Sequence, residues 1–177
     1  MGEYDKAHSC YEKALKIRQK PVSSDHPSLA ISYNNIAGLY NTRADYLTAL
    51  SFFKQALEIR QVTYHQNHPS VAQSYSNIAA VYDNMGEYFE ALTFNEKALN
   101  IRHTILSPDH PDLAQSYSNI AMVYNKMANY SEALSFCQKA VEIRKKNFSS
   151  GHPHMVIHCS NIVVSSTQQE MIGRQSF

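Results

Sequence analysis

The hexapeptide SYSNIA at Ser74–Ala79 is repeated letter for letter at Ser116–Ala121. A close copy, SYNNIA, covers Ser32–Ala37, and a more divergent one, HCSNIV, covers His158–Val163. Each copy begins 42 residues after the previous one. A fixed spacing of this size is typical of proteins built from repeated structural units, so the hexapeptide marks one position in each unit.

The similarity extends over the whole unit. Residues 69–110 and 111–152 are identical at 23 of 42 aligned positions. Two dipeptides recur with the same spacing: His-Pro begins at His26, His68, His110 and His152, and Ile-Arg begins at Ile17, Ile59, Ile101 and Ile143. Self-similarity with a period of about 20–50 residues predicts a solenoid or a propeller.

The hydrophobic pattern within a unit is helical. In residues 71–85 the apolar positions lie three or four residues apart, as on one face of a helix. They are Val71, Ala72, Tyr75, Ile78, Ala79 and Tyr82. Residues 88–102 carry a second stripe, formed by Tyr88, Ala91, Leu92, Ala98, Leu99 and Ile101. No segment alternates with the period of a strand, so each unit is predicted to be a pair of helices.

The residues between the stripes fit helix ends. Asp25, Asn67 and Asp109 precede His-Pro, which predicts an N-capping residue and a proline in the first turn. Gly86 lies between the two stripes, where a turn is expected. Because a helix pair cannot bury its stripes alone, neighbouring pairs must stack. We therefore predict an all-α fold of the α-solenoid type.

The residues of one unit also carry a family signature. Their order resembles that of tetratricopeptide repeats, which is bulky, Leu, small, Tyr, small, Tyr, Ala, aromatic and Ala. The residues that match it, in the same order, are Tyr117, Ile120, Ala121, Tyr124, Ala128, Tyr130, Ala133, Phe136 and Ala140. The 42-residue length, with D-H-P before the first helix and A-L-x-I-R closing the second, resembles kinesin light chain repeats and their nephrocystin-like relatives. The resemblance implies helix-turn-helix hairpins stacked in a right-handed superhelix.

The register of the repeat predicts the domain organisation. A single array should cover residues 1–164, followed by a degenerate tail at 166–177. Its parts are the second helix of a partial repeat at 1–20, complete repeats at 27–62, 69–104 and 111–146, and the first helix of a partial repeat at 153–165. Both ends are unfinished hairpins, so we expect a fragment of a longer array or a chain whose ends associate.

Composition limits the partners and the location. The net charge of +1 does not indicate a nucleic-acid or membrane surface, and no apolar run approaches the roughly 20 residues that span a bilayer. The first ten residues lack the apolar core of a signal peptide. Three widely spaced cysteines predict reduced thiols. These features predict a cytoplasmic protein.

The sequence does not assemble a catalytic or metal site. The histidines of the His-Pro dipeptides stand one unit apart, so we interpret them as helix-entry residues. His154, His158 and Cys159 could share a metal, but a fourth ligand is missing. Glycines are scattered singly, so there is no phosphate-binding loop. We expect neither an enzyme nor a cofactor.

A recurring asparagine is the main candidate for binding. It stands at Asn35, Asn77, Asn119 and Asn161. The family resemblance implies that the first helices line a concave groove and that this asparagine hydrogen-bonds a bound peptide. An amide suits that task because it offers both a donor and an acceptor. The alternative is a solvated residue, or one that braces the next hairpin.

The same register predicts the rest of the groove lining. Its members are mostly polar: Asn34, Ser76, Ser118, Ser160, Gly38, Ala80, Met122, Asn41, Asp83, Asn125, Thr42, Asn84 and Lys126. This lining is nearly neutral, whereas the kinesin light chain grooves that take acidic, tryptophan-bearing peptides are more basic. We therefore expect a mainly neutral, extended peptide whose side chains enter small pockets beside Gly38 and Ala80.

One core slot is unusual. Asn95 occupies the position held by Tyr11, Phe53 and Cys137 in the other units. Either this asparagine is buried with a partner, or the slot is more open than the signature suggests.

These features predict a protein–protein interaction module with an adaptor or scaffold role. Its partner would be a peptide segment of another protein, with no nucleic acid and no membrane involved. Two alternatives stay open. The unfinished ends favour a self-associating structural array, and the resemblance also fits a regulatory appendage of a larger enzyme such as an ADP-ribosyltransferase.

Overall fold

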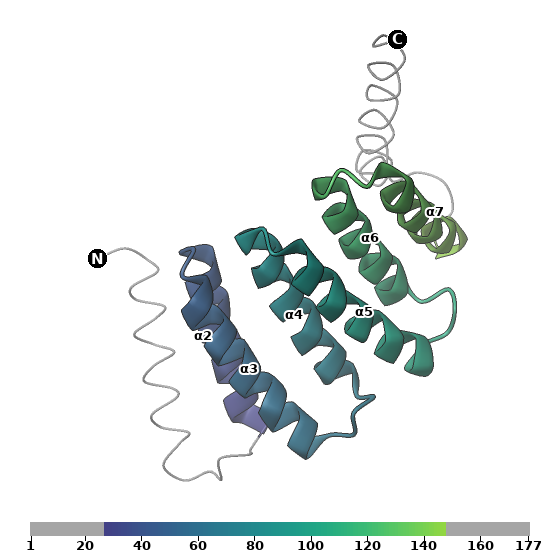
Figure 1. The fold of residues 1–177 in the computed structure, drawn as a ribbon. Coiled ribbons are helices and arrows are strands. Elements are labelled where there is room, and N and C mark those ends of the chain that lie inside the picture. The colour runs from purple at the N-terminus through teal and green to yellow at the C-terminus, as the bar shows by residue number, and fades with distance from the viewer. Residues whose placement is uncertain (1–26, 148–177) are drawn as a thin grey trace, which may run out of the picture. The chain divides into compact units, whose positions relative to one another are not determined.

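The computed structural model describes residues 27–147, and every regular element in that range is an α-helix (Figure 1). The helices are α2 (Pro27–Thr42), α3 (Tyr46–Thr63), α4 (Pro69–Met85), α5 (Tyr88–Ile105), α6 (Pro111–Lys126) and α7 (Tyr130–Asn147). The prediction of an all-α protein made of helix pairs is confirmed. The expected partial repeats at 1–20 and 153–165, and the tail at 166–177, lie outside the described residues.

The helices pair as hairpins, α2 with α3, α4 with α5, and α6 with α7. The described chain divides into two compact units, of which one contains α2 to α5 and the other contains α6 and α7. In the first unit α3 also packs against α4, so the two hairpins stack. Among residues 27–147, no helix is both long and apolar enough to span a membrane.

A core cluster joins the two hairpins of the first unit. It contains Ala37 of α2, Leu50 and Phe53 of α3, and Ile78 and Val81 of α4, together with a buried Ala49. Because the cluster takes side chains from three helices, burying it requires both hairpins. Stacking and core formation are therefore the same event.

Arg60 adds a polar link between the hairpins. From the last turn of α3, its Nη1 donates hydrogen bonds to the carbonyl of Ser70, 3.3 Å away, and to the hydroxyl of Ser74, both on α4. Burial lowers the pKa of the Arg60 guanidinium, against a smaller opposite effect of Tyr64. The arginine that ends α3 thus fixes the start of the next repeat.

The N-caps of α4 and α6 are histidines, whereas Asp45 caps α3. Nδ1 of His68 accepts a hydrogen bond from the backbone N–H of Ser70, and Nδ1 of His110 accepts one from Asp112, each at 3.1 Å. The prediction that Asn67 and Asp109 act as caps is therefore wrong for these two helices; Asp25 lies outside the described residues. The cap falls on the residue directly before the N1 proline, where an imidazole nitrogen reaches the free N–H groups.

The turns inside the hairpins share one left-handed residue. Gly86 has φ 81°, and the alanines one repeat away on either side have nearly the same conformation, with φ 59° at Ala44 and φ 60° at Ala128. Glycine adopts this conformation without strain, whereas alanine does not. The turn geometry is therefore kept even where the residue type opposes it.

Two core positions answer sequence-based questions. Asn95 is buried, with only 5% of its surface exposed, so its slot is not open. Cys137, at the equivalent position, is also buried and is disulfide-bonded. The expectation of reduced thiols is therefore wrong for this cysteine, which is the one cysteine within residues 27–147.

Candidate functional site

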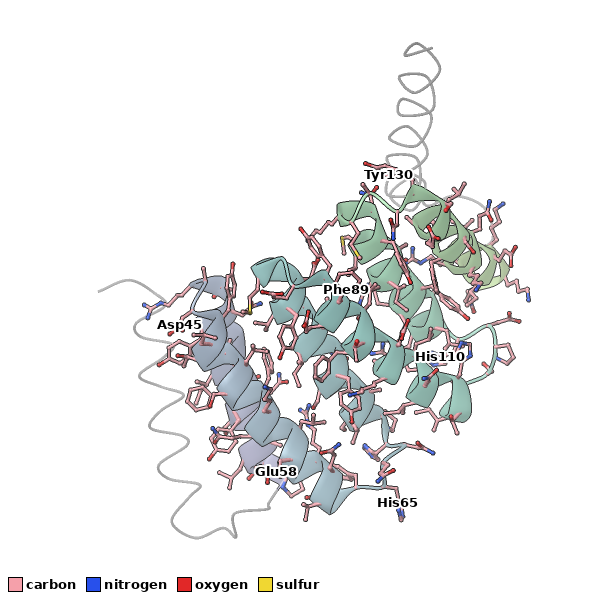
Figure 2. The ribbon with its side chains drawn as sticks, viewed as in Figure 1. Asp45, Glu58, His65, Phe89, His110 and Tyr130 are labelled. Atoms are coloured by element: carbon pink, nitrogen blue, oxygen red, sulfur yellow. The ribbon has the colours of Figure 1, made fainter. Side chains whose placement is uncertain are left out.

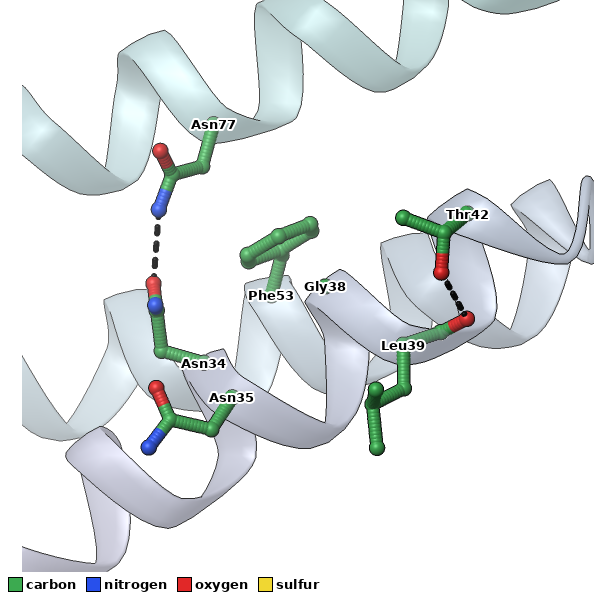
Figure 3. Close-up of a pocket in the computed structure, with 7 residues that line it drawn as sticks. All are labelled: Asn34, Asn35, Gly38, Leu39, Thr42, Phe53 and Asn77. Carbon is green, nitrogen blue, oxygen red and sulfur yellow. Dashed lines mark hydrogen bonds between the residues drawn. The ribbon is translucent and has the colours of Figure 1, made fainter. Parts of the chain in front are cut away.

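The first unit contains a pocket of about 370 Å³ (Figure 3). It is lined by residues of α2, α3 and α4, namely Asn34, Asn35, Gly38, Leu39, Thr42, Phe53 and Asn77. All seven side chains are uncharged. The pocket therefore offers amide groups and apolar surface to a ligand, and no ion-pairing group.

Amide groups form the rim of this pocket. Nδ2 of Asn77 donates a 2.7 Å hydrogen bond to Oδ1 of Asn34, which joins α4 to α2 (Figure 3). One turn earlier on α4, Nε2 of Gln73 donates to Oδ1 of Asn77 at 2.9 Å. Asn77 therefore uses both ends of its amide, and the three side chains form a short hydrogen-bonded chain.

The wall of the pocket is apolar and incompletely filled. Phe53 of α3 is buried, and it belongs to the core cluster that joins the hairpins. Gly38 lies on α2 facing this space, and a Cβ atom built on it would meet nothing within 4 Å. The hydroxyl of Thr42 donates to the carbonyl of Leu39 at 2.8 Å and so is turned to its own helix. The pocket is thus open at Gly38.

A second amide bridge lies seven residues further along the same pair of helices. Nδ2 of Asn84 donates to Oδ1 of Asn41 at 3.1 Å. Seven residues are about two helical turns, so both bridges lie on the same faces of α2 and α4. In each bridge the α4 residue donates and the α2 residue accepts.

The structure brings seven of the predicted groove residues together. Five of them line the pocket, namely Asn34, Asn35, Gly38, Thr42 and Asn77, and Asn41 and Asn84 form the second bridge.

Ser76 has a different environment from these amides. It is buried, at 9% exposure, and its hydroxyl accepts a 3.1 Å hydrogen bond from Nη1 of the buried Arg102. Ala80, beside which a second pocket was expected, is exposed on α4.

Most of the remaining predicted groove residues lie on α6, in the second unit. Oδ1 of Asn119 accepts a 2.8 Å hydrogen bond from Gln115, as Asn77 does from Gln73. Met122 is 44% exposed, and Oδ1 of Asn125 is buried without a hydrogen-bond partner in the described part of the chain. The others on this helix are Ser118, half-buried, and Lys126, exposed. Ser160 and Asn161 lie outside the described residues.

Sequence reasoning missed three residues of this site. Leu39 and Phe53 line the pocket, and Gln73 completes its amide rim. The glutamine had a readable signal, because a Gln four residues before an Asn on a helix predicts a side-chain hydrogen bond. Phe53 had none, because its position follows the pattern of an ordinary core residue.

No other chemistry emerges within residues 27–147. In this range no group of three or more His, Cys, Asp or Glu side chains is placed to hold a metal ion. The pocket and the amide bridges are therefore the features of the described chain that bear on binding.

A family model of the tetratricopeptide repeat matches residues 1–61 and 70–146, most of the chain. The chain belongs to the tetratricopeptide repeat family. Its 42-residue repeats, its helix pairs and this match confirm the family assignment made from the signature residues. Proteins of this family are generally protein–protein interaction modules. No curated protein matches the sequence.

Solved tetratricopeptide structures resemble this one closely. The nearly identical TPR-like repeats of a kinesin light chain candidate from Podosopora anserina share 24% identity with a TM-score of 0.79, over 98% of this chain and 83% of that chain. BtubC (BKLC) from P. vanneervenii shares 21% identity with a TM-score of 0.80, over 94% and 67%. The apo form of RapI shares 19% identity with a TM-score of 0.77, over 95% and 45%. At these identities the likeness is one of fold.

Proposed function

We propose that this tetratricopeptide repeat protein binds an extended, mainly neutral peptide along α2 and α4, with one apolar side chain in the pocket beside Gly38. The observation that carries the proposal is the composition of this pocket, which has an amide rim, an apolar wall and no charged group. A peptide in extended conformation presents both of these surfaces, because its backbone is polar and its side chains alternate.

The amide rim has unused hydrogen-bonding capacity. Oδ1 of Asn34 accepts from Asn77, but in residues 27–147 no hydrogen bond engages Nδ2 of Asn34. The amide of Asn77 also keeps a second N–H. These groups would donate to peptide carbonyls without breaking the bridge. A bound backbone needs such partners, because a buried carbonyl without a hydrogen bond costs roughly 1–3 kcal/mol.

The apolar wall of the pocket determines which peptide side chain would fit there. The space at Gly38 borders Leu39 and Phe53, so a branched aliphatic side chain would bury apolar surface there. A charged side chain would lose hydration without finding a counter-ion, because every lining residue is neutral. The pocket therefore favours Leu, Ile or Val in the peptide.

Gly38→Leu in the full chain tests the proposal. The new side chain would occupy the pocket without a clash at its Cβ atom. The substitution should also stabilise α2, because leucine has a higher helix propensity than glycine. We expect a melting temperature equal to or above that of wild type, together with loss of the peptides that wild type selects from a displayed random library. Asn100→Leu, on an exposed position of α5, is the matched control and should keep those peptides.

Peptide selection that Gly38→Leu leaves unchanged would contradict the pocket as the site. Asn77→Ala combined with Asn119→Ala is less decisive alone, because Asn77→Ala also removes the bridge to Asn34. Comparing this pair with Gly38→Leu separates lost binding from lost packing.

We also propose an adaptor role and a cytoplasmic location for the chain. Fluorescence microscopy of the tagged full chain tests the location. A signal spread through the cytoplasm would support it, whereas a signal confined to a membrane-bounded compartment would contradict it. Self-association and an enzyme-linked role remain predictions.

A further inference from the structure

The histidine N-caps of α4 and α6 contain titratable side chains that lie outside the proposed peptide site. Nδ1 of His68 and Nδ1 of His110 each accept a hydrogen bond from the second residue of a helix. An imidazole nitrogen accepts a hydrogen bond only when it carries no proton. We propose that these caps make the junction between repeats sensitive to pH between about 7 and 5, and that His68 supplies most of this sensitivity.

A proton on the cap has two unfavourable effects. It removes the acceptor that satisfies the backbone N–H of Ser70, and it places a positive charge at the positive end of the helix dipole. Histidine side chains ordinarily gain a proton as the pH falls from about 7 to 5. Both effects exist only in the folded chain, so a proton on the cap costs the folded state this contact and leaves the unfolded state unaffected. Stability must then fall with decreasing pH.

The cap of His68 lies at the junction between two hairpins. Its ring stacks on Tyr64, with centroids 4.0 Å apart and planes 11° apart. Tyr64 is the C-cap residue of α3, while His68 begins α4. Losing this cap therefore weakens the turn that connects α3 to α4.

The charges around His68 oppose a further positive charge. Arg60 of α3 binds the carbonyl of Ser70, two residues beyond His68, and the first turn of α4 has no acidic residue. The titratable groups of the turn are Tyr64, stacked on the ring, and His65, whose carbonyl accepts from the N–H of His68. No carboxylate of α3, the turn or the start of α4 is bound to His68 to offset its proton.

His110 has the opposite surroundings. Asp109 precedes it and pairs with Lys146 of α7 at 2.7 Å, and Asp112 lies in the first turn of α6. Carboxylates at these positions place negative charge at the start of α6, which offsets part of the cost of a positive charge there. The pH dependence at His110 is therefore smaller than at His68.

Thermal unfolding of the full chain at pH values from 8 to about 5, at constant ionic strength, tests the proposal. Wild type should melt several degrees lower at about pH 5 than at about pH 7. His68→Asn should lose at least half of that difference, because asparagine is a good N-cap that does not titrate. His110→Asn should change it less. His65→Asn is the control, because His65 is exposed in the same turn and caps no helix (Figure 2).

A pH dependence in His68→Asn equal to that of wild type would overturn the proposal. Nitrogen NMR of the wild-type histidines gives a second test that needs no variant. At about pH 7 the His68 ring should carry its proton on Nε2, with Nδ1 bare. A proton on Nδ1 of His68 at that pH would overturn the proposal as well.

Discussion

Asn77 of α4 donates a 2.7 Å hydrogen bond to Asn34 of α2, and the two residues are 43 positions apart in a chain whose repeat is 42. The offset of one means that the bridge joins unlike positions of neighbouring repeats. Asn77 is the equivalent of Asn35, whereas the equivalent of Asn34 in the next repeat is Ser76. An asparagine pair of this kind is therefore particular to the α2–α4 pair among the described repeats.

Removing the Asn77–Asn34 bridge should destabilise the first unit. We expect a coupling free energy of about 0.5–1.5 kcal/mol between Asn34→Ala and Asn77→Ala in a double-mutant cycle measured by urea unfolding. The same cycle on Asn41 and Asn84, whose bridge is longer and exposed, should give a smaller coupling. Equal couplings in the two cycles would show that the first bridge has no special weight.

Substitutions at the left-handed turn residues should change the free energy of unfolding in opposite directions at alanine and at glycine. Ala44→Gly and Ala128→Gly should each raise the free energy of unfolding by about 0.5–1 kcal/mol, and Gly86→Ala should lower it by about 1–2 kcal/mol. The control is Ala80→Gly, inside α4, which should lower it by about 1 kcal/mol. A loss of stability in Ala44→Gly and Ala128→Gly would contradict the strain at these turns.

The buried Asn95 should be a weak point of α5. Its side chain is only 5% exposed and occupies the slot that Phe53 and Cys137 fill in the neighbouring repeats, where an amide stabilises the core less than an apolar side chain. We expect Asn95→Leu, which is similar in size, to raise the free energy of unfolding by about 1 kcal/mol. Asn100→Leu, on the exposed side of α5, should change it by less than about 0.5 kcal/mol. Equal effects would mean that burial at Asn95 is not the cause.

The Lys146–Asp109 pair predicts an alkaline pH dependence. The hydrogen bond and the charge of Asp109 raise the pKa of the Lys146 ammonium. A raised folded-state pKa stabilises the fold below the usual lysine value of about 10.4, and this contribution disappears as the pH rises through the higher folded value. Both groups are exposed, so Lys146→Gln should cost little at about pH 7. The difference in Tm between Lys146→Gln and wild type should vanish above that folded pKa and in concentrated salt. A difference that persists under these conditions would show that the attraction between Lys146 and Asp109 is not its cause.

The helix pairs could be predicted because their signals are local. The stripe from Val71 to Tyr82, and the proline at Pro69, depend on neighbours within a few turns. The N-caps were predicted one residue too early from the sequence, because asparagine caps helices more often than histidine does. Whether Asn67 or His68 caps α4 depends on which side chain faces the free N–H groups of the helix, and only the three-dimensional structure shows this.

The site could be predicted in part. A pocket was expected beside Gly38, and Asn34 was expected to line the groove; both residues line the pocket formed by α2, α3 and α4, and their role in peptide binding stays a prediction. For Asn77 the alternatives were a free groove amide and a brace for the next hairpin. In the first unit it braces α2, and only a structure could show this, because its partner lies on another hairpin.

By itself the sequence determined that this protein is a series of helix pairs with a 42-residue period, since helix formation and hairpin turns depend on residues close together in the chain. The tertiary structure alone decided which amides meet, which histidine nitrogen caps a helix and where the wall stays open at Gly38. Each of these depends on side chains brought within a few ångströms by packing, and a repeating sequence does not distinguish neighbours that are 42 residues apart from those that are 43 apart.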